Sequence, residues 1–217
     1  MVTGTRPDLA FLVGMLSTFL SNPDQAHAQL PYQVLRFLRH PARLCFRRAP
    51  TDGTGFDIKM YVDASWGSDP NTSRSVSGYI LQVNGNTVSW ASKRQSCVAK
   101  STCEAEYMAC SYAVTHLIWA KRVLLDLSCP IATCVLATDN QAAIALVKDQ
   151  KVNARTKHIA IHFHFVRERY LAGDFDIQHV ASAENLADIC TKSLPKPAFQ
   201  ALSTAIGLRG GTSSRHK

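Results

Sequence analysis

Four acidic residues stand where the chain passes from one predicted element to the next. They are Asp63, Glu106, Asp139 and Asp188, in a chain of 217 residues with only 16 acidic side chains. Carboxylates that lie close together repel one another, so a site built from them needs cations to be stable. Mg²⁺ prefers oxygen ligands and keeps waters that phosphate oxygens can replace. A pair of such ions can activate a water and stabilise a leaving oxygen. The four residues therefore indicate metal-dependent phosphodiester hydrolysis.

Each carboxylate also has an ordinary structural explanation. An aspartate at a strand end often serves in a turn, Asp139 can cap the helix that follows it, and an exposed Asp188 on a helix is unremarkable. Glu104 competes with Glu106 for the helical position. The stretch 101–104 matches the capping box S-x-x-E, which gives Glu104 a local task. Residues two apart do not share a helix face, so only one of the two glutamates belongs to the site.

The elements that must position these residues follow from hydrophobic periodicity. Alternating patterns predict strands, and the Asn84-Gly85 pair predicts a hairpin between the second and third of them. The predicted strands are 56–62, 77–83, 87–91, 133–138 and 175–180, and the predicted helices are 102–127, 140–148, 156–171 and 184–191. The order β-β-β-α-β-α-β-α predicts an α/β fold with a mixed five-stranded sheet and helices packed on it. In such a sheet, carboxylates at strand ends and helix starts can meet at one edge.

The first 50 residues differ from the rest. They carry helical patterns at 8–20 and 30–39, and six arginines against two aspartates. Residues 49–55 have the composition of a linker. The chain is therefore divided into a helical segment (1–50), a linker (51–55), the main domain (56–194), and a C-terminal helix with a basic tail (195–217).

Composition excludes some classes of protein and favours others. A net charge of +8 and a pI near 9.3 favour a polyanionic partner. No apolar run reaches the roughly 18 residues that a membrane span requires, so no membrane partner is expected. No glycine-rich nucleotide-binding motif is present. The apolar stretch 9–20, followed by Ala26-His27-Ala28, has some features of a secretory signal, but Asp8 and a thin basic region argue against it.

Seven blocks of the sequence occur in a distinctive order. They are YVDASW at 61–66, SRSVSGYI at 73–80, VSWASKRQ at 88–95, STCEAEYMA at 101–109, TDNQAAI at 138–144, RTKHIAIHFHFVRE at 155–168 and NLADICTK at 185–192. Together they closely resemble the ribonuclease H domain of copia-type retrotransposon Pol polyproteins. Residues 5–23 also resemble the end of the reverse transcriptase in these polyproteins. The resemblance thus makes 1–50 a remnant of that segment, and it replaces the secretory interpretation.

The resemblance implies a ribonuclease H-like fold that cuts the RNA strand of RNA/DNA hybrids with two Mg²⁺ ions, Mn²⁺ being the alternative. It assigns catalysis and metal binding to Asp63, Asp139 and Asp188. The alanine-rich run after Glu106 favours Glu106 over Glu104 as the remaining carboxylate. The residues expected to contact the substrate are Ser65, Trp66, Arg74, Ser101, Asn140 and Gln141. The expected partners are the hybrid and the reverse transcriptase domain of the parent polyprotein. The expected location is the cytoplasm, in a virus-like particle, or the nucleus, rather than outside the cell.

Other interpretations stay open at this level. His158 and His162 have the i, i+4 spacing of zinc ligands, but no H-E-x-x-H motif is present and contact with phosphate is the stronger interpretation. The loop before Asp188 lacks the histidine that many cellular ribonucleases H carry there. The main alternative function is an inactive or repurposed fragment that binds nucleic acid without cutting it. A related nuclease that cuts DNA is a third interpretation.

Overall fold

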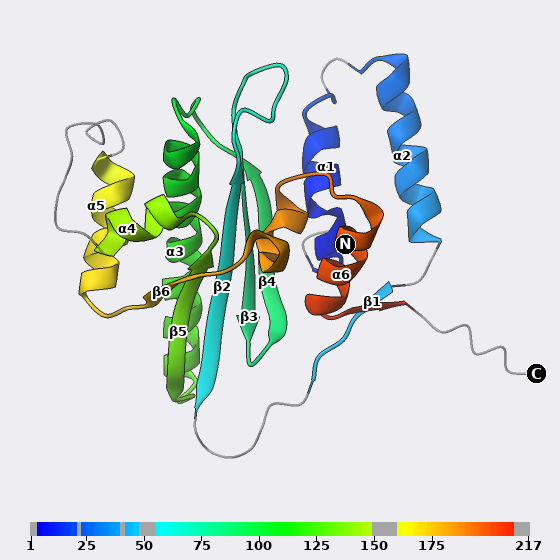
Figure 1. Cartoon of the computed structure of the whole chain (residues 1–217). Coiled ribbons are helices and arrows are strands. Elements are labelled where there is room, and N and C mark those ends of the chain that lie inside the picture. Colours follow the sequence, from blue (N-terminus) through cyan, green and yellow to red (C-terminus); the bar gives the residue numbers. More distant parts are fainter. Residues whose placement is uncertain (1–3, 21–22, 40–41, 48–54, 149–159, 211–217) are drawn as a thin grey trace, which may run out of the picture.

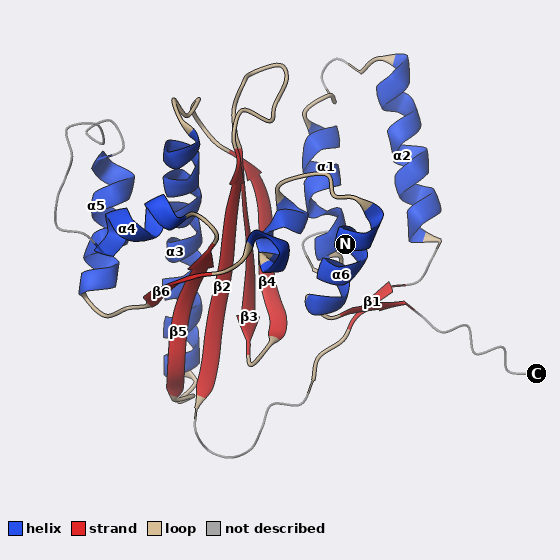
Figure 2. Ribbon diagram, viewed as in Figure 1, coloured by secondary structure: helices blue, strands red, loops and turns tan. Residues whose placement is uncertain are grey.

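A twisted mixed sheet forms the centre of the molecule (Figures 1 and 2). The computed structural model describes residues 4–20, 23–39, 42–47, 55–148 and 160–210. The sheet consists of β2 (Phe56–Ser65), β3 (Val76–Val83), β4 (Asn86–Arg94), β5 (Ile131–Thr138) and β6 (Asp176–His179). Its strand order is β4-β3-β2-β5-β6. The pairs among β2, β3 and β4 are antiparallel, whereas β5 pairs parallel to both β2 and β6. The predicted α/β fold class with a mixed five-stranded sheet is confirmed.

Helical elements lie on both sides of this sheet (Figure 2). One side carries α3 (Thr102–Asp126), α4 (Gln141–Lys148) and α5 (Ala160–Leu171). The other side carries η1 (Pro7–Leu9), α1 (Ala10–Ser17), α2 (Gln25–Leu38), η4 (Leu186–Cys190) and α6 (Lys196–Ala205). The remaining elements are the 3₁₀ turn η3 (Ser182–Glu184) and a small ribbon of β1 (Ala42–Leu44) paired antiparallel with β7 (Leu208–Gly210).

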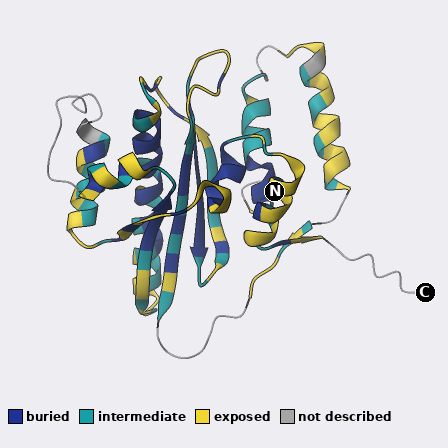
Figure 3. Cartoon of the chain, in the orientation of Figure 1, coloured by how far each residue is buried: buried dark blue, intermediate teal, exposed yellow. Residues whose placement is uncertain are grey.

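Two hydrophobic cores follow from the alternation of side chains along the strands. Ile58, Met60 and Val62 of β2 are fully buried beneath α3 and belong to the larger core. Tyr61 and Ile80 point to the other face and belong to the smaller core, together with residues of η4 and α6. Figure 3 shows the buried middle of the strands between the two layers. Because Asp63 follows Val62, its side chain points to the face on which η4 lies.

The hairpin between β3 and β4 has the turn that the Asn84-Gly85 pair predicts. Asn84 and Gly85 have φ angles of +48° and +71°. A type I′ turn needs positive φ at both central residues, and asparagine and glycine tolerate that best. The turn fixes the register of β3 against β4, and the predicted hairpin is confirmed.

Several predicted boundaries were wrong. The last helix, expected at 184–191, is two short 3₁₀ turns interrupted at Asn185. The helix expected at 30–39 begins at Gln25, because the Asp24 side chain accepts a hydrogen bond from the His27 amide and caps it. β1 and β7 were not predicted, since three-residue strands have no readable periodicity. Residues 51–54 of the linker and 156–159 of the predicted helix lie outside the described residues. Within the described chain, no helix is both long and apolar enough to cross a bilayer.

Candidate active site

Three of the four predicted carboxylates lie together beside the sheet. Asp63 lies inside β2, and Asp139 directly follows β5. β2 and β5 are parallel neighbours, so these two residues come to the same end of the sheet. Glu106 is in the first turns of α3, which packs across β2. One carboxylate oxygen from each of the three residues lies within 4.8 Å of the others. We call these three residues the carboxylate cluster.

Glu106 is the member of the cluster whose pKa is shifted strongly from its ordinary value. Its side chain is buried, and one carboxylate oxygen has no hydrogen-bond partner. Burial, followed by the charges of Asp63 and Asp139, raises the pKa of Glu106 to about 9. Without a metal ion, Glu106 is therefore protonated at neutral pH. A bound cation would reverse this by favouring the ionised form.

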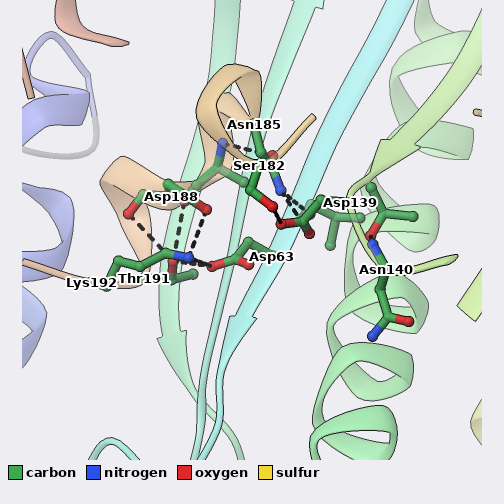
Figure 4. Close-up of polar contacts among 11 residues, drawn as sticks. Asp63, Asp139, Asn140, Ser182, Asn185, Asp188, Thr191 and Lys192 are labelled. Carbon is green, nitrogen blue, oxygen red and sulfur yellow. Dashed lines mark hydrogen bonds and ion pairs between the residues drawn. The ribbon is translucent and has the colours of Figure 1, made fainter. Parts of the chain in front are cut away.

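The fourth carboxylate, Asp188, lies on η4 beside the cluster and is joined to it by Lys192 (Figure 4). The Lys192 ammonium lies 2.9 Å from an oxygen of Asp188 and 3.5 Å from an oxygen of Asp63. Burial and the charge of Asp63 raise the pKa of Asp188 to about 6 despite this ion pair. Burial lowers the pKa of Lys192, but the negative charges of Asp63 and Asp188 raise it by more, so the pKa of Lys192 is raised overall. Lys192 thus supplies the positive charge on this side of the carboxylates.

One short stretch, residues 182–192, provides most of the other polar contacts of the aspartates (Figure 4). Ser182 donates to Asp139 at 2.7 Å. The Asn185 amide lies 3.0 Å from the Val62 carbonyl and 3.4 Å from Asp139. The Thr191 hydroxyl donates a hydrogen bond to Asp63. The 182–192 segment therefore orients two aspartates of the cluster and carries the fourth carboxylate itself.

Sequence reasoning missed these supporting residues. A signal was present, because the block at 185–192 has polar residues at its start and end around Asp188. In addition, the loop that lacks a histidine places Ser182 against Asp139 instead.

Gly78 lets η4 approach the sheet closely enough for these contacts. It lies opposite Asp63 in the register of β3 against β2. A Cβ atom at Gly78 would lie 2.5 Å from the Thr191 methyl group and 2.9 Å from the Cys190 Cβ. Such distances cannot be accommodated without moving η4 or the strand. Glycine at 78 is therefore a requirement of packing rather than of backbone conformation.

We expect Gly78→Ala to weaken both the fold and the site. Overpacking of this kind costs about 1–3 kcal/mol of unfolding free energy, and displacement of Thr191 would loosen its hydrogen bond to Asp63. Denaturant unfolding and Mg²⁺ titration would measure the two effects. The matched control is Gly14→Ala in α1, where the nearest atom to a Cβ is 3.6 Å away. Alanine there is expected to be neutral or stabilising, because it favours helix more than glycine does.

Glu104 and Glu106 have different surroundings. The Glu104 carboxylate accepts a hydrogen bond from the Lys100 amide at 2.6 Å, and the Glu104 amide donates to the Ser101 hydroxyl. Glu104 is thus engaged at the start of α3, whereas Glu106 lies in the carboxylate cluster. The geometry favours Glu106, and its catalytic role stays a prediction.

The six residues predicted to contact substrate have varied environments. Ser65 and Arg74 are half-buried, and Gln141 is exposed at the start of α4. Trp66 is 52% exposed, and its indole N–H donates to the Ala99 carbonyl, which fixes the ring at the surface. Ser101 caps α3, while the Asn140 side chain accepts from the Ala143 amide and caps α4. Their contact with substrate stays a prediction.

The predicted histidine pair is only partly described. His158 lies outside the described residues. The His162 ring is 3.1 Å from the Ser111 hydroxyl on α3.

The donors present fit a hard divalent cation. The cluster offers carboxylate oxygens only, which suit Mg²⁺ or Mn²⁺ rather than a soft metal. The partnerless, buried oxygen of Glu106 is a second indication, because such an atom normally has a partner. Asp63, Glu106 and Asp139 are the residues that would hold such an ion.

Comparison with known proteins places this geometry in context. No family model matches the sequence. The chain is 37% identical over 206 residues to the retrovirus-related Pol polyprotein from transposon TNT 1-94 of Nicotiana tabacum, covering 94% of the chain but 15% of that polyprotein. It is also 45% identical over 117 residues to secreted RxLR effector protein 161 of Plasmopara viticola, covering 53% of the chain and 80% of that protein. Among solved structures, LC11-RNase H1, isolated from compost, is 19% identical with a TM-score of 0.47 and covers 67% of this chain and 96% of that chain.

Proposed function

The chain belongs to the copia-type retrotransposon Pol polyproteins, of which it matches one segment, and from this we propose that it is a ribonuclease that cuts the RNA strand of RNA/DNA hybrids. The observation that carries the proposal is the convergence of Asp63, Glu106 and Asp139, with ligand oxygens within 4.8 Å of one another. Their positions in the chain fall within the sequence blocks on which the family resemblance rests.

In this proposal the four carboxylates hold two divalent ions. Asp63 and Asp139 bind them most directly, and Glu106 and Asp188 complete the two sites. When bound, such ions lower the pKa of a water and stabilise the leaving oxygen. The chain's own groups orient the ligands: Ser182 and Asn185 hold Asp139, while Thr191 and Lys192 hold Asp63. Attack of water on phosphorus and departure of the 3′ oxygen leave a 3′-hydroxyl and a 5′-phosphate.

Substrate recognition would rest on backbone and sugar contacts rather than on bases. RNA/DNA hybrids are recognised by shape and by the 2′-hydroxyl. Ser65, Trp66 and Gln141 follow Asp63 or Asp139 closely in the chain, and we propose that they meet the backbone; Ser65 is half-buried, and the other two are exposed. The +8 charge of the chain supports binding of a polyanion. The relatives are Pol polyproteins of transposons, and we propose the reverse transcriptase domain as the neighbour in such a parent chain. The proposed place of action is the cytoplasmic particle or the nucleus.

The proposal is tested by incubating an end-labelled RNA/DNA hybrid with the full chain and Mg²⁺. We expect the RNA strand to be cut, and we expect neither strand of a DNA duplex to be cut. A chelator should abolish cutting, and added Mg²⁺ or Mn²⁺ should restore it.

Two outcomes would contradict the proposal. Salt-sensitive binding of the hybrid without cutting at any metal concentration would identify a nucleic-acid-binding fragment instead. Cutting of the DNA duplex would identify a nuclease of another specificity.

A further inference from the structure

The element that carries Asp188 is too short to hold its own position. η4 has five residues in 3₁₀ geometry. Helices of this kind have poorly aligned hydrogen bonds and contribute little stability of their own. The positions of Asp188 and of the following Lys192 therefore depend on what packs against η4.

The inner side of η4 lies directly on the sheet. Gly78 allows the close approach, and Ile80 of β3 belongs to the same buried core as Leu186 and Ile189. The Asn185 side chain holds the start of η4 to the Val62 carbonyl of β2. These contacts fix η4 from one side only.

The first described residues of the chain also pack against η4. Both η1 and α1 pack against η4. Ala10 of α1 is buried in one core with Ile189 and Cys190. Leu9 is 2% exposed, and a surface groove is lined by Leu9, Ile189 and Lys192 together. The N-terminal segment thus reaches the neighbourhood of the ammonium group that pairs with two aspartates.

η1 is itself firmly fixed. Arg6 donates two hydrogen bonds to Asp8, at 2.9 and 2.7 Å, and both side chains are buried. The Arg6 guanidinium also lies 5.2 Å from the centre of the Phe37 ring of α2. Pro7 restricts the backbone at the first position of η1. A buried, paired and stacked arginine makes η1 a defined support rather than a loose end.

The C-terminal segment closes the same core. Leu202 and Ile206 of α6 and Leu208 of β7 lie in it with Ala10. α6 also packs against η4, so the C-terminal segment contributes to the same support, and β7 pairs with β1.

We infer that residues 4–19, assigned from sequence to the end of a neighbouring domain, are a positioning element of the metal site. By packing against η4 they hold Asp188 and Lys192 in place. The role in a metal site rests on the proposed function, whereas the support of η4 by residues 4–19 can be tested without it. Leu9 is the residue through which it can be tested, because its side chain is almost fully buried, lines a groove together with Ile189, and has no atom that could bind a metal ion.

The test compares Leu9→Ala with Leu117→Ala in the full chain. Both leucines are almost fully buried, but Leu117 lies in α3 within the larger core. Both variants are expected to melt at lower temperature. Only Leu9→Ala is expected to raise the Mg²⁺ concentration for half-maximal thermal stabilisation, by roughly tenfold, as changes outside the ligand set do. It should also speed hydrogen exchange selectively at 186–192, and Leu9→Met should restore both properties.

The outcomes separate this inference from the proposed function. Equal Mg²⁺ dependence and equal exchange at 186–192 in the two alanine variants would overturn it and leave residues 4–19 a purely structural addition. Faster hydrogen exchange at 186–192 in Leu9→Ala alone supports the inference even if the unchanged chain cuts no hybrid, because the exchange measurement does not depend on catalysis.

Discussion

Replacement of Asp63 by asparagine is expected to lower the rate of RNA-strand cleavage by about a hundredfold or more, the scale on which loss of one electrostatic stabiliser acts. Asp63 is 3% exposed and lies in the centre of the polar contacts, touching both Thr191 and Lys192. Asparagine keeps its size and can still accept the Thr191 hydrogen bond, but it carries no charge to hold a cation. Asp139→Asn should have a similar effect, measured by single-turnover cleavage of the labelled hybrid.

Stability measurements separate loss of the site from loss of the fold. In chelator, Asp63→Asn should melt at the same temperature as the unchanged chain or higher, because one of the repelling charges is gone. The matched control is Asp57→Asn on the same strand. The Asp57 side chain is exposed and accepts a hydrogen bond from Thr133 at 2.6 Å, away from the cluster. Equal cleavage rates in the Asp63 and Asp57 variants would show that the site lies elsewhere.

Replacement of Glu106 by glutamine is expected to abolish most activity and yet stabilise the metal-free protein at alkaline pH. Burial and the neighbouring aspartates raise the pKa of Glu106 to about 9 in the folded chain, against an ordinary value of 4.5. The folded state therefore binds one more proton than the unfolded state between these values. The stability that this proton contributes is fully present below about pH 4.5 and is lost as the pH rises through about 9, at up to roughly 1.4 kcal/mol per pH unit.

Glutamine resembles the protonated acid, so the Glu106→Gln variant should lose less stability with rising pH. Thermal unfolding in chelator at several values between about pH 7.5 and 9 would measure this, above the range in which Asp188, with a pKa raised to about 6, titrates. At saturating Mg²⁺ the unchanged chain should be the more stable of the two proteins, because it offers the metal a full set of carboxylate ligands and the Glu106→Gln variant does not. Glu104→Gln is the control, since its carboxylate pairs with the Lys100 amide. A flatter pH profile in Glu104→Gln than in Glu106→Gln would assign the glutamate of the site to Glu104.

Features that depend on neighbouring residues could be predicted from the amino-acid sequence. Alternating side chains predicted the strands, because a half-buried strand has a period of two. Asn84-Gly85 predicted the hairpin, because its backbone needs positive φ. The strand patterns predicted Asp63 and Asp139 at the ends of two strands. Asp139 directly follows β5, whereas β2 continues to Ser65, two residues beyond Asp63. The choice between Glu104 and Glu106 needed the family resemblance, because both lie in the first turns of one helix.

Features that join distant parts of the chain became apparent in the folded structure alone. Thr191 and Asp63 are 128 residues apart, so nothing local predicts their hydrogen bond. The high pKa of Glu106 arises from burial beneath other elements and cannot be read from its neighbours in sequence. The packing of η1 on η4 joins the two ends of the chain, and its short elements carry no periodicity. Long-range contacts form because they bury surface and charge that no single segment can bury alone. The residues that orient the carboxylates could therefore be identified only in the folded chain.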